Sequence, residues 1–127
     1  MTVEGDYDHS GATPMTLRRD AIAGAAEMVS AIEAIANDAD DGGDIVATVG
    51  EFSPNGGAIN KVCGEVSFAV DIRSNDEAYR DEVETQVLDR VREIADDRDL
   101  DVDTTLLDRS APVELDERVR EQLVELV

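Results

Sequence analysis

Three polar residues in this chain have side chains suited to binding a small anionic ligand. His9 is the only histidine, and it lies in the turn His-Ser-Gly-Ala-Thr-Pro-Met at 9–15. A histidine N–H can stabilise an oxyanion, and the amide of Asn60 can donate and accept hydrogen bonds at once. The planar guanidinium of Arg73 can hold a carboxylate through two parallel hydrogen bonds. Together these groups would suit a ligand that carries a carboxylate and an amide-like group.

Each of the three residues also has an ordinary structural explanation. His9 could be a turn histidine bonded to the backbone, and Asn60 could cap a turn or the start of a strand. Arg73 could pair with a neighbouring acid, either Asp71 or Asp76. The residue types alone leave both explanations open.

Metal chemistry within this chain is not expected, because the chain offers no second histidine for a metal pair. The acidic runs at 38–41 and 96–101 lack the alternating spacing of a calcium loop, so we expect solvated surface there. Cys63 is the only cysteine, and we expect it to be a small packed residue. A single cysteine cannot form an intrachain disulfide, which fits a reducing cytoplasm.

The charge balance is the strongest compositional feature. The chain of 127 residues has 31 acidic and 11 basic residues, for a net charge of −20. Free binding to nucleic acid is not expected, because phosphate contacts need a basic surface. We expect no membrane partner either, since no stretch approaches the roughly 18 uninterrupted apolar residues of a membrane span, and the N-terminus lacks the pattern of a signal peptide. We interpret the acidity as adaptation to a very salty cytoplasm, where a Debye length of about 3 Å screens the self-repulsion.

Apolar periodicity predicts the elements that must position these groups. Helical spacing predicts a helix over 14–36, with Thr13 as its cap and Pro14 at its first position. Ser74 and Glu77 form a capping box before a second helix. Alternation predicts a long strand over 59–73. Shorter strands are expected over 2–6, 44–52 and 100–107, and a further helix from Leu115.

The order β-α-β-β-α-β is typical of the ferredoxin-like α+β fold. It has a four-stranded antiparallel sheet with two helices on one face, followed in this chain by the C-terminal helix. Its second and fourth strands lie at the sheet edges, and the ends of the long strand need not lie near the first turn. The strand at 44–52 carries few charges that would block pairing. We therefore expect a homodimer through strand 44–52, with the 14–36 helices nearby.

Two blocks of residues resemble a known family over nearly the whole chain. The first is Gly-Asp-Tyr-Asp-His-Ser-Gly-Ala-Thr-Pro-Met at 5–15, followed by Arg-Arg-Asp-Ala at 18–21. The second comprises 46–50, Pro54-Asn55, Asn60 and Gly-Glu-Val-Ser-Phe-Ala-Val-Asp-Ile-Arg at 64–73. In order and spacing both resemble the dimetal amidohydrolases that include N-carbamoyl-L-amino-acid hydrolase, allantoate amidohydrolase and β-alanine synthase. The two blocks together are fairly specific, whereas either alone would be weak.

The resemblance implies that 1–110 is a lid and dimerisation domain and that 111–127 begins the return to a catalytic domain. In that family two divalent metals, such as zinc or manganese, are held by the catalytic domain, so no metal is expected in this chain. His9 would enter the active site of the partner subunit and stabilise the tetrahedral intermediate. Asn60 and Arg73 would bind a small substrate, with the arginine on its carboxylate.

The function implied is dimerisation and substrate capping in an enzyme that cleaves N-carbamoyl amino acids or related linear amides. The fragment alone would be inactive, since the family's metal-binding stretches are absent from it. Two alternatives stay open. The chain could be a free-standing ferredoxin-like module that binds amino acids in regulation, or the lid of a related metallopeptidase or aminoacylase.

Overall fold

Strand β5 (Glu65–Arg73) organises the sheet in the computed structural model, which describes residues 1–40 and 44–106. Its alternating apolar residues face the helices. It pairs on both sides, with β3 (Val46–Pro54) and with β1 (Thr2–Glu4). The short strand β6 (Asp101–Asp103) pairs with the free side of β1. The order is β3-β5-β1-β6 with all pairs antiparallel, which confirms the ferredoxin-like prediction and places β3 and β6 at the edges.

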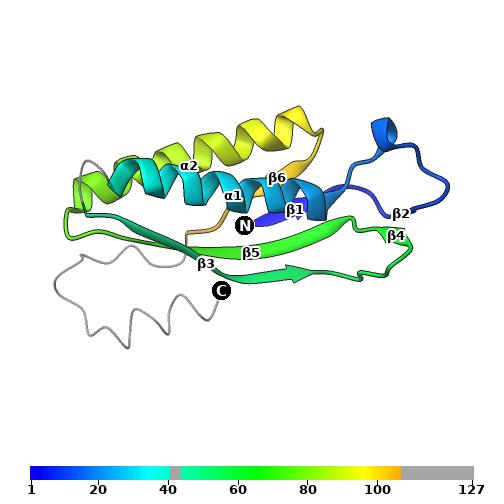
Figure 1. Ribbon diagram of the computed structural model, residues 1–127, viewed down its shortest axis with the longest axis horizontal. Helices are drawn as coiled ribbons and strands as arrows, with labels where there is room; N and C mark the ends of the chain where they lie inside the picture. The colour runs from blue at the N-terminus through cyan, green and yellow to red at the C-terminus, as the bar shows by residue number, and fades with distance from the viewer. Residues whose placement is uncertain (41–43, 107–127) are drawn as a thin grey trace.

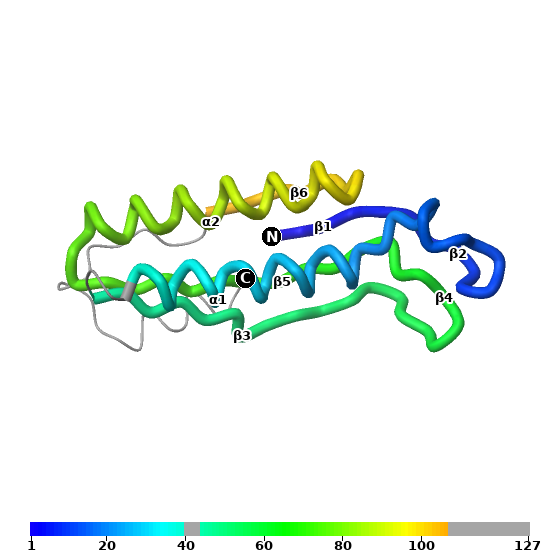
Figure 2. Tube along the Cα trace, turned by 45° about the horizontal axis from the view of Figure 1, so that its top comes forward, coloured from blue at the N-terminus to red at the C-terminus, as the bar shows by residue number. Residues whose placement is uncertain are grey.

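Helices α1 (Ala21–Asp40) and α2 (Glu77–Asp97) lie side by side on one face of this sheet (Figures 1 and 2). The core between the two layers is aliphatic apart from one aromatic ring, Phe68, and its largest fully buried side chains are Met28, Ile32, Ile94, Val3, Val66, Val83, Val87 and Val91. Burying such side chains drives the packing of the two layers. No helix in the described ranges is long and apolar enough to cross a membrane.

The first helix begins later than predicted. Met15–Leu17 form a short 3-10 turn (η1), and α1 starts only at Ala21. Thr13 was the wrong cap, because its hydroxyl donates to the carbonyl of His9. Asp20 takes that role, since its carboxylate accepts hydrogen bonds from two amides of the first helical turn, Ile22 N and Ala23 N, at 3.0 and 3.1 Å.

The second helix is also capped by a different residue from the one predicted. Asp76 is its N-cap and accepts from Tyr79 N at 3.2 Å. The Ser74 hydroxyl instead accepts from the backbone of Asp76 at 3.1 Å. The serine therefore shapes the approach to the helix, and the predicted capping box is not formed.

The end of α2 is closed by a left-handed residue. Asp99 has φ 57°, and its N–H donates to Asp96 O at 3.2 Å. Leu100 N donates to Ala95 O at 2.8 Å, which completes the Schellman arrangement of a helix C-terminus. This closure turns the chain directly into β6.

The long strand predicted over 59–73 is interrupted at Cys63 and Gly64. Its first part is β4 (Lys61–Val62), which leaves the sheet and pairs with β2 (Asp8–His9) in a separate two-stranded ribbon. Figure 2 shows this ribbon extending beyond the end of the two helices. The helix predicted from Leu115 and the boundary near residue 110 lie outside the described residues.

Candidate functional site

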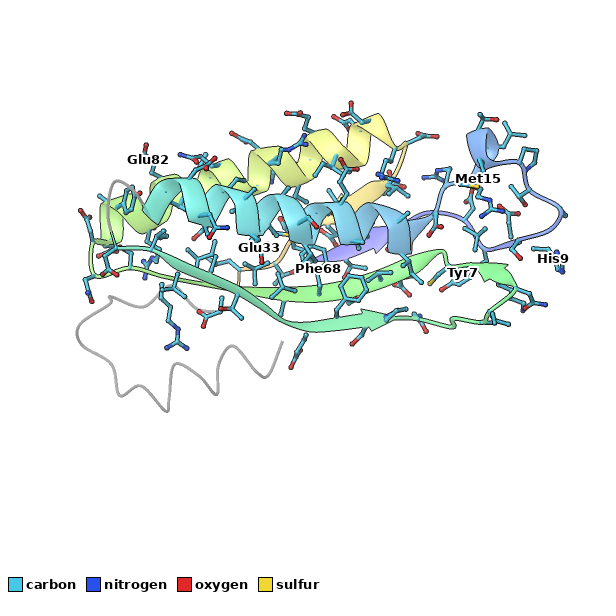
Figure 3. The ribbon with its side chains drawn as sticks, viewed as in Figure 1. Tyr7, His9, Met15, Glu33, Phe68 and Glu82 are labelled. Atoms are coloured by element: carbon cyan, nitrogen blue, oxygen red, sulfur yellow. The ribbon has the colours of Figure 1, made fainter. Side chains whose placement is uncertain are left out.

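His9 lies at the tip of the β2–β4 ribbon, and its side chain is exposed (Figure 3). It pairs directly opposite Lys61, the only lysine of the chain. Side chains that face each other across an antiparallel pair share one face of the ribbon. The imidazole and the ammonium group therefore point to the same side of the tip.

Hydrogen bonds within the turn after His9, and from it to Asn60, hold its backbone in place. The carbonyl of His9 accepts from Ala12 N at 3.1 Å and from the Thr13 hydroxyl at 3.2 Å. Ser10 N donates to Asn60 O at 2.9 Å, which fastens the turn to the residue before β4. These bonds fix the backbone on both sides of the imidazole.

The imidazole itself is oriented by Gly11. The Gly11 N–H donates to His9 Nδ1 at 3.1 Å, so the neutral ring carries its proton on Nε2. A Cβ added at residue 11 would lie 3.4 and 3.5 Å from two atoms of the ring, about van der Waals contact, so the ring packs against Gly11. No described residue bonds to Nε2, and the ring presents an N–H donor to the surroundings.

Asn60 is brought next to the His9 turn, although the element order alone left open whether the ends of the long strand lie near it. Its backbone carbonyl bonds to Ser10, and its side-chain amide is exposed, without a hydrogen-bond partner in the described part of the chain. The interruption of the long strand at Cys63 and Gly64 causes this proximity, because β4 turns away to pair with β2.

Arg73 lies at the opposite end of β5. Its Nε donates to Asp71 Oδ2 at 2.7 Å, which is one of the two ion pairs that the sequence suggested. The eight residue steps of β5 cover about 26 Å at the usual rise of a strand. A small ligand cannot bridge that length, so His9 and Arg73 of one copy cannot hold the same molecule.

Tyr7 supports the base of the ribbon. Its hydroxyl donates to Asn55 O at 2.6 Å, and its ring lies against Gly64, where an added Cβ would be 2.6 Å away. Asn55 in turn donates to Glu65 Oε2 at 2.5 Å. Desolvation, with smaller contributions from Cys63 and Glu65, raises the pKa of Tyr7 above its ordinary value of 10.0. The phenol therefore remains a donor at neutral pH.

Cys63 is buried and packed, as expected. Its thiol contacts the carbonyl oxygen of Glu65 at 3.1 Å. Within residues 1–40 and 44–106, no three histidine, cysteine, aspartate or glutamate side chains come together in a way that could hold a metal ion. The chemistry of the ribbon is therefore that of a hydrogen-bond donor in an exposed position.

The fold and the ribbon define an α+β domain that presents one oriented histidine from the far end of its sheet. Residues 1–99 match the family model described as "Peptidase dimerisation domain", and the chain belongs to this family. It is 37% identical over 120 residues to N-carbamoyl-L-amino acid amidohydrolase from Geobacillus stearothermophilus, covering 94% of this chain and 29% of that relative. It is 28% identical to allantoate amidohydrolase from Escherichia coli, covering 99% of this chain and 30% of that protein.

Solved structures agree with these relationships. The crystal structure of AtUAH in complex with glyoxylate matches with a TM-score of 0.83 and 30% identity, over 98% of this chain and 29% of that one. An amidase of the hydantoinase/carbamoylase family from Burkholderia multivorans matches with a TM-score of 0.74 and 35% identity, over 79% and 24%. The chain thus spans less than a third of the length of the relatives that it matches.

Proposed function

We propose that this chain is the dimerising and substrate-capping domain of a metal-dependent amidohydrolase that cleaves N-carbamoyl amino acids or related linear amides. The observation that carries the proposal is the exposed His9 ring, held through Nδ1 by Gly11 with Nε2 facing outward. An N–H fixed in this way can donate to the oxyanion that forms when water attacks an amide carbon. The names of the matched relatives supply the substrate class.

The metals of such an enzyme would lie in another part of the protein. Metal ligands at a dimetal site are several histidines and carboxylates, and His9 is the only histidine of this chain. The described residues do not fit a metal centre. The role proposed for this chain is accordingly limited to donation by His9, substrate binding and dimer formation.

Substrate binding would need residues from two copies of the chain. Asn60 lies beside His9, and its amide could orient the substrate at the same tip. Arg73 is about 26 Å along β5 from that end, and it would hold a substrate carboxylate in a different active site of the dimer. To do so its guanidinium must turn part of its donor fork from Asp71 to the ligand. This separation supports a site shared between subunits.

The dimer itself would form through the edge strand β3, with α1 nearby. β3 is nine residues long and bears one acidic residue, Glu51. Val46 on this strand is 57% exposed, and Ile22 on α1 is also exposed. No strand of the described residues pairs with the outer side of β3, and such an edge offers backbone groups to a second copy.

Replacing Val46 and Thr48 together by lysine tests the dimer. Pairing would bury the lysine ammonium groups against the partner strand, so we expect a dimer in molar KCl to dissociate at least tenfold more readily, measured by sedimentation. Thr105→Lys, on the exposed segment after β6, is the matched control and should leave the association unchanged. A monomeric parent chain in molar salt would contradict the proposal.

His9→Gln in the enzyme that contains this domain tests the proposed catalytic role. Loss of one oxyanion donor should lower kcat by about 10²–10³-fold for an N-carbamoyl amino acid. Thr16→Ala, on the exposed η1 turn, is the control. An unchanged kcat in the His9 variant would refute the role. The 127-residue chain alone should show no hydrolysis with added zinc or manganese, and binding of free amino acids by that chain would favour a regulatory module instead.

A further inference from the structure

The guanidinium of Arg18 spans the turn that carries His9. Its Nη2 donates to Ser10 O at 2.6 Å, and its Nε donates to Thr13 O at 3.0 Å. Arg18 lies between η1 and α1, so these bonds fasten the turn to the segment that leads into the first helix. We propose that Arg18 is a positioning residue that fixes the direction of the His9 imidazole through this turn.

The choice of partners distinguishes Arg18 from its neighbours. Other arginines on the surface pair with carboxylates, such as Arg19 with Asp6 at 3.1 Å and Arg98 with Glu27 at 2.6 Å. In the described part of the chain Arg18 has no ion pair, although acidic residues outnumber basic ones almost threefold. Its half-buried charge is directed instead at two backbone carbonyls.

The two bonds act on residues 10–13, the part of the turn next to the His9 ring. Within the turn, the Ala12 and Thr13 donors both return to the carbonyl of His9. Ser10 N fastens the turn to Asn60 on the β4 side. Among the hydrogen bonds of the described residues, only those of the Arg18 guanidinium join residues 10–13 to the segment that leads into α1. Without it, the flexible backbone at Gly11 is held on one side alone, and the bond from Gly11 to His9 Nδ1 weakens.

Arginine suits this task in a way that lysine does not. A guanidinium presents several N–H groups in one plane, so it can donate to two carbonyls that face different edges of the fork. An ammonium group is a compact charge on a flexible stem, and it cannot hold both acceptors in fixed directions. Arg18→Lys should therefore behave like Arg18→Gln and should not restore the turn.

The first test needs no variant and does not depend on the proposed function. In NMR spectra of the full chain, Arg18 Nε–H should give a sharp resonance protected from solvent exchange. The Nε–H of Arg92, which is exposed and has no ion pair in the described part of the chain, should exchange freely. Rapid exchange at both sites would overturn the proposal.

The second test compares Arg18→Lys and Arg18→Gln with the control Arg92→Gln. Losing the hydrogen bonds from the charged guanidinium should loosen the turn, so we expect the Gly11 amide to exchange about tenfold faster in both Arg18 variants. The ¹⁵N shifts of the His9 ring should move as the bond to Nδ1 is lost, while amides in α2 keep their protection. Unchanged Gly11 exchange and unchanged His9 shifts would overturn the proposal.

The inference connects to the proposed function through kinetics. In the enzyme that contains this domain, Arg18→Lys should lower kcat more than it changes KM. The substitution leaves the substrate-binding residues in place and disturbs only the direction of His9. If the NMR changes occur but kcat does not fall, Arg18 still positions His9, and the oxyanion role of His9 is the part that fails.

Discussion

Gly5 lies between β1 of the sheet and β2 of the ribbon, and replacing it by alanine should destabilise the packing of the ribbon on the sheet. The added Cβ would lie 2.0 Å from the carbonyl oxygen of Arg19 and 2.8 Å from a methyl group of Leu100. Neither backbone can retreat freely. Gly5 N is bonded to Gly64 O at 2.8 Å, and the next residue, Asp6, donates to Arg19 O at 2.9 Å.

The size of the effect follows from what must give way. Relief of the clash breaks the bond between Asp6 and Arg19, which costs about 1 kcal/mol. It also strains a packed region, at about 1–3 kcal/mol for overpacking. The expected loss of unfolding free energy is therefore about 2–4 kcal/mol, or a fall in Tm of roughly 8–16 °C for a domain of this size.

Urea unfolding in molar KCl, followed by circular dichroism, measures this loss. Gly50→Ala is the matched control, because nothing lies within 4 Å of a Cβ at that position and its φ is not positive. We expect the control to stay within about 0.5 kcal/mol of the parent chain. If the two variants were equally stable, the close approach of Gly5 to Arg19 would not be a feature of the folded protein.

Three further predictions concern stability. Asp99→Gly should stabilise the chain by about 0.5–1 kcal/mol, because residue 99 has a left-handed backbone that glycine adopts without strain; a urea midpoint at or below that of the parent would contradict this. We propose that the net charge of −20 is an adaptation to molar salt, so Tm should rise steadily from dilute buffer to molar KCl, and a flat profile would count against it. Because desolvation raises the pKa of Tyr7 above its unfolded value of 10.0, stability that is present below pH 10.0 should be lost as pH rises through the higher folded value. Tyr7→Phe should remove that alkaline loss, which a pH series of thermal melts would show.

The fold could be predicted from periodicity because the core-facing apolar residues of β5 recur at every second position, and those of α2 recur at helical spacing. The start of α1 could not. Thr13-Pro14 and Asp20 are both sound capping signals, and the choice between them depends on contacts that are distant in sequence. The approach of Arg19 to Gly5 and Asp6 keeps the chain extended just before Asp20, so the helix begins after it.

In the candidate site, too, some residues could be predicted from the sequence and others only from contacts in the folded chain. His9 stood out as the only histidine, placed in a turn that contains Gly11. The residues that support its ribbon and turn, Tyr7 and Arg18, carried no signal by residue type, because one resembles a surface tyrosine and the other an ordinary cation. Only the crossing of the turn by the Arg18 guanidinium and the contact of the Tyr7 ring with Gly64 reveal what they support.

The two edges of the sheet differ in a way that limits how many copies can join. Strand β3 offers nine residues, whereas β6 offers three, and Asp101 and Asp103 place a negative charge at each end of it. A strand this short and this acidic is a poor template for a further chain. In the dimer proposed through β3, the longer edge of each copy would be occupied, and association would stop at two chains. The short acidic edge of β6 would then disfavour open-ended, fibre-like association of this domain.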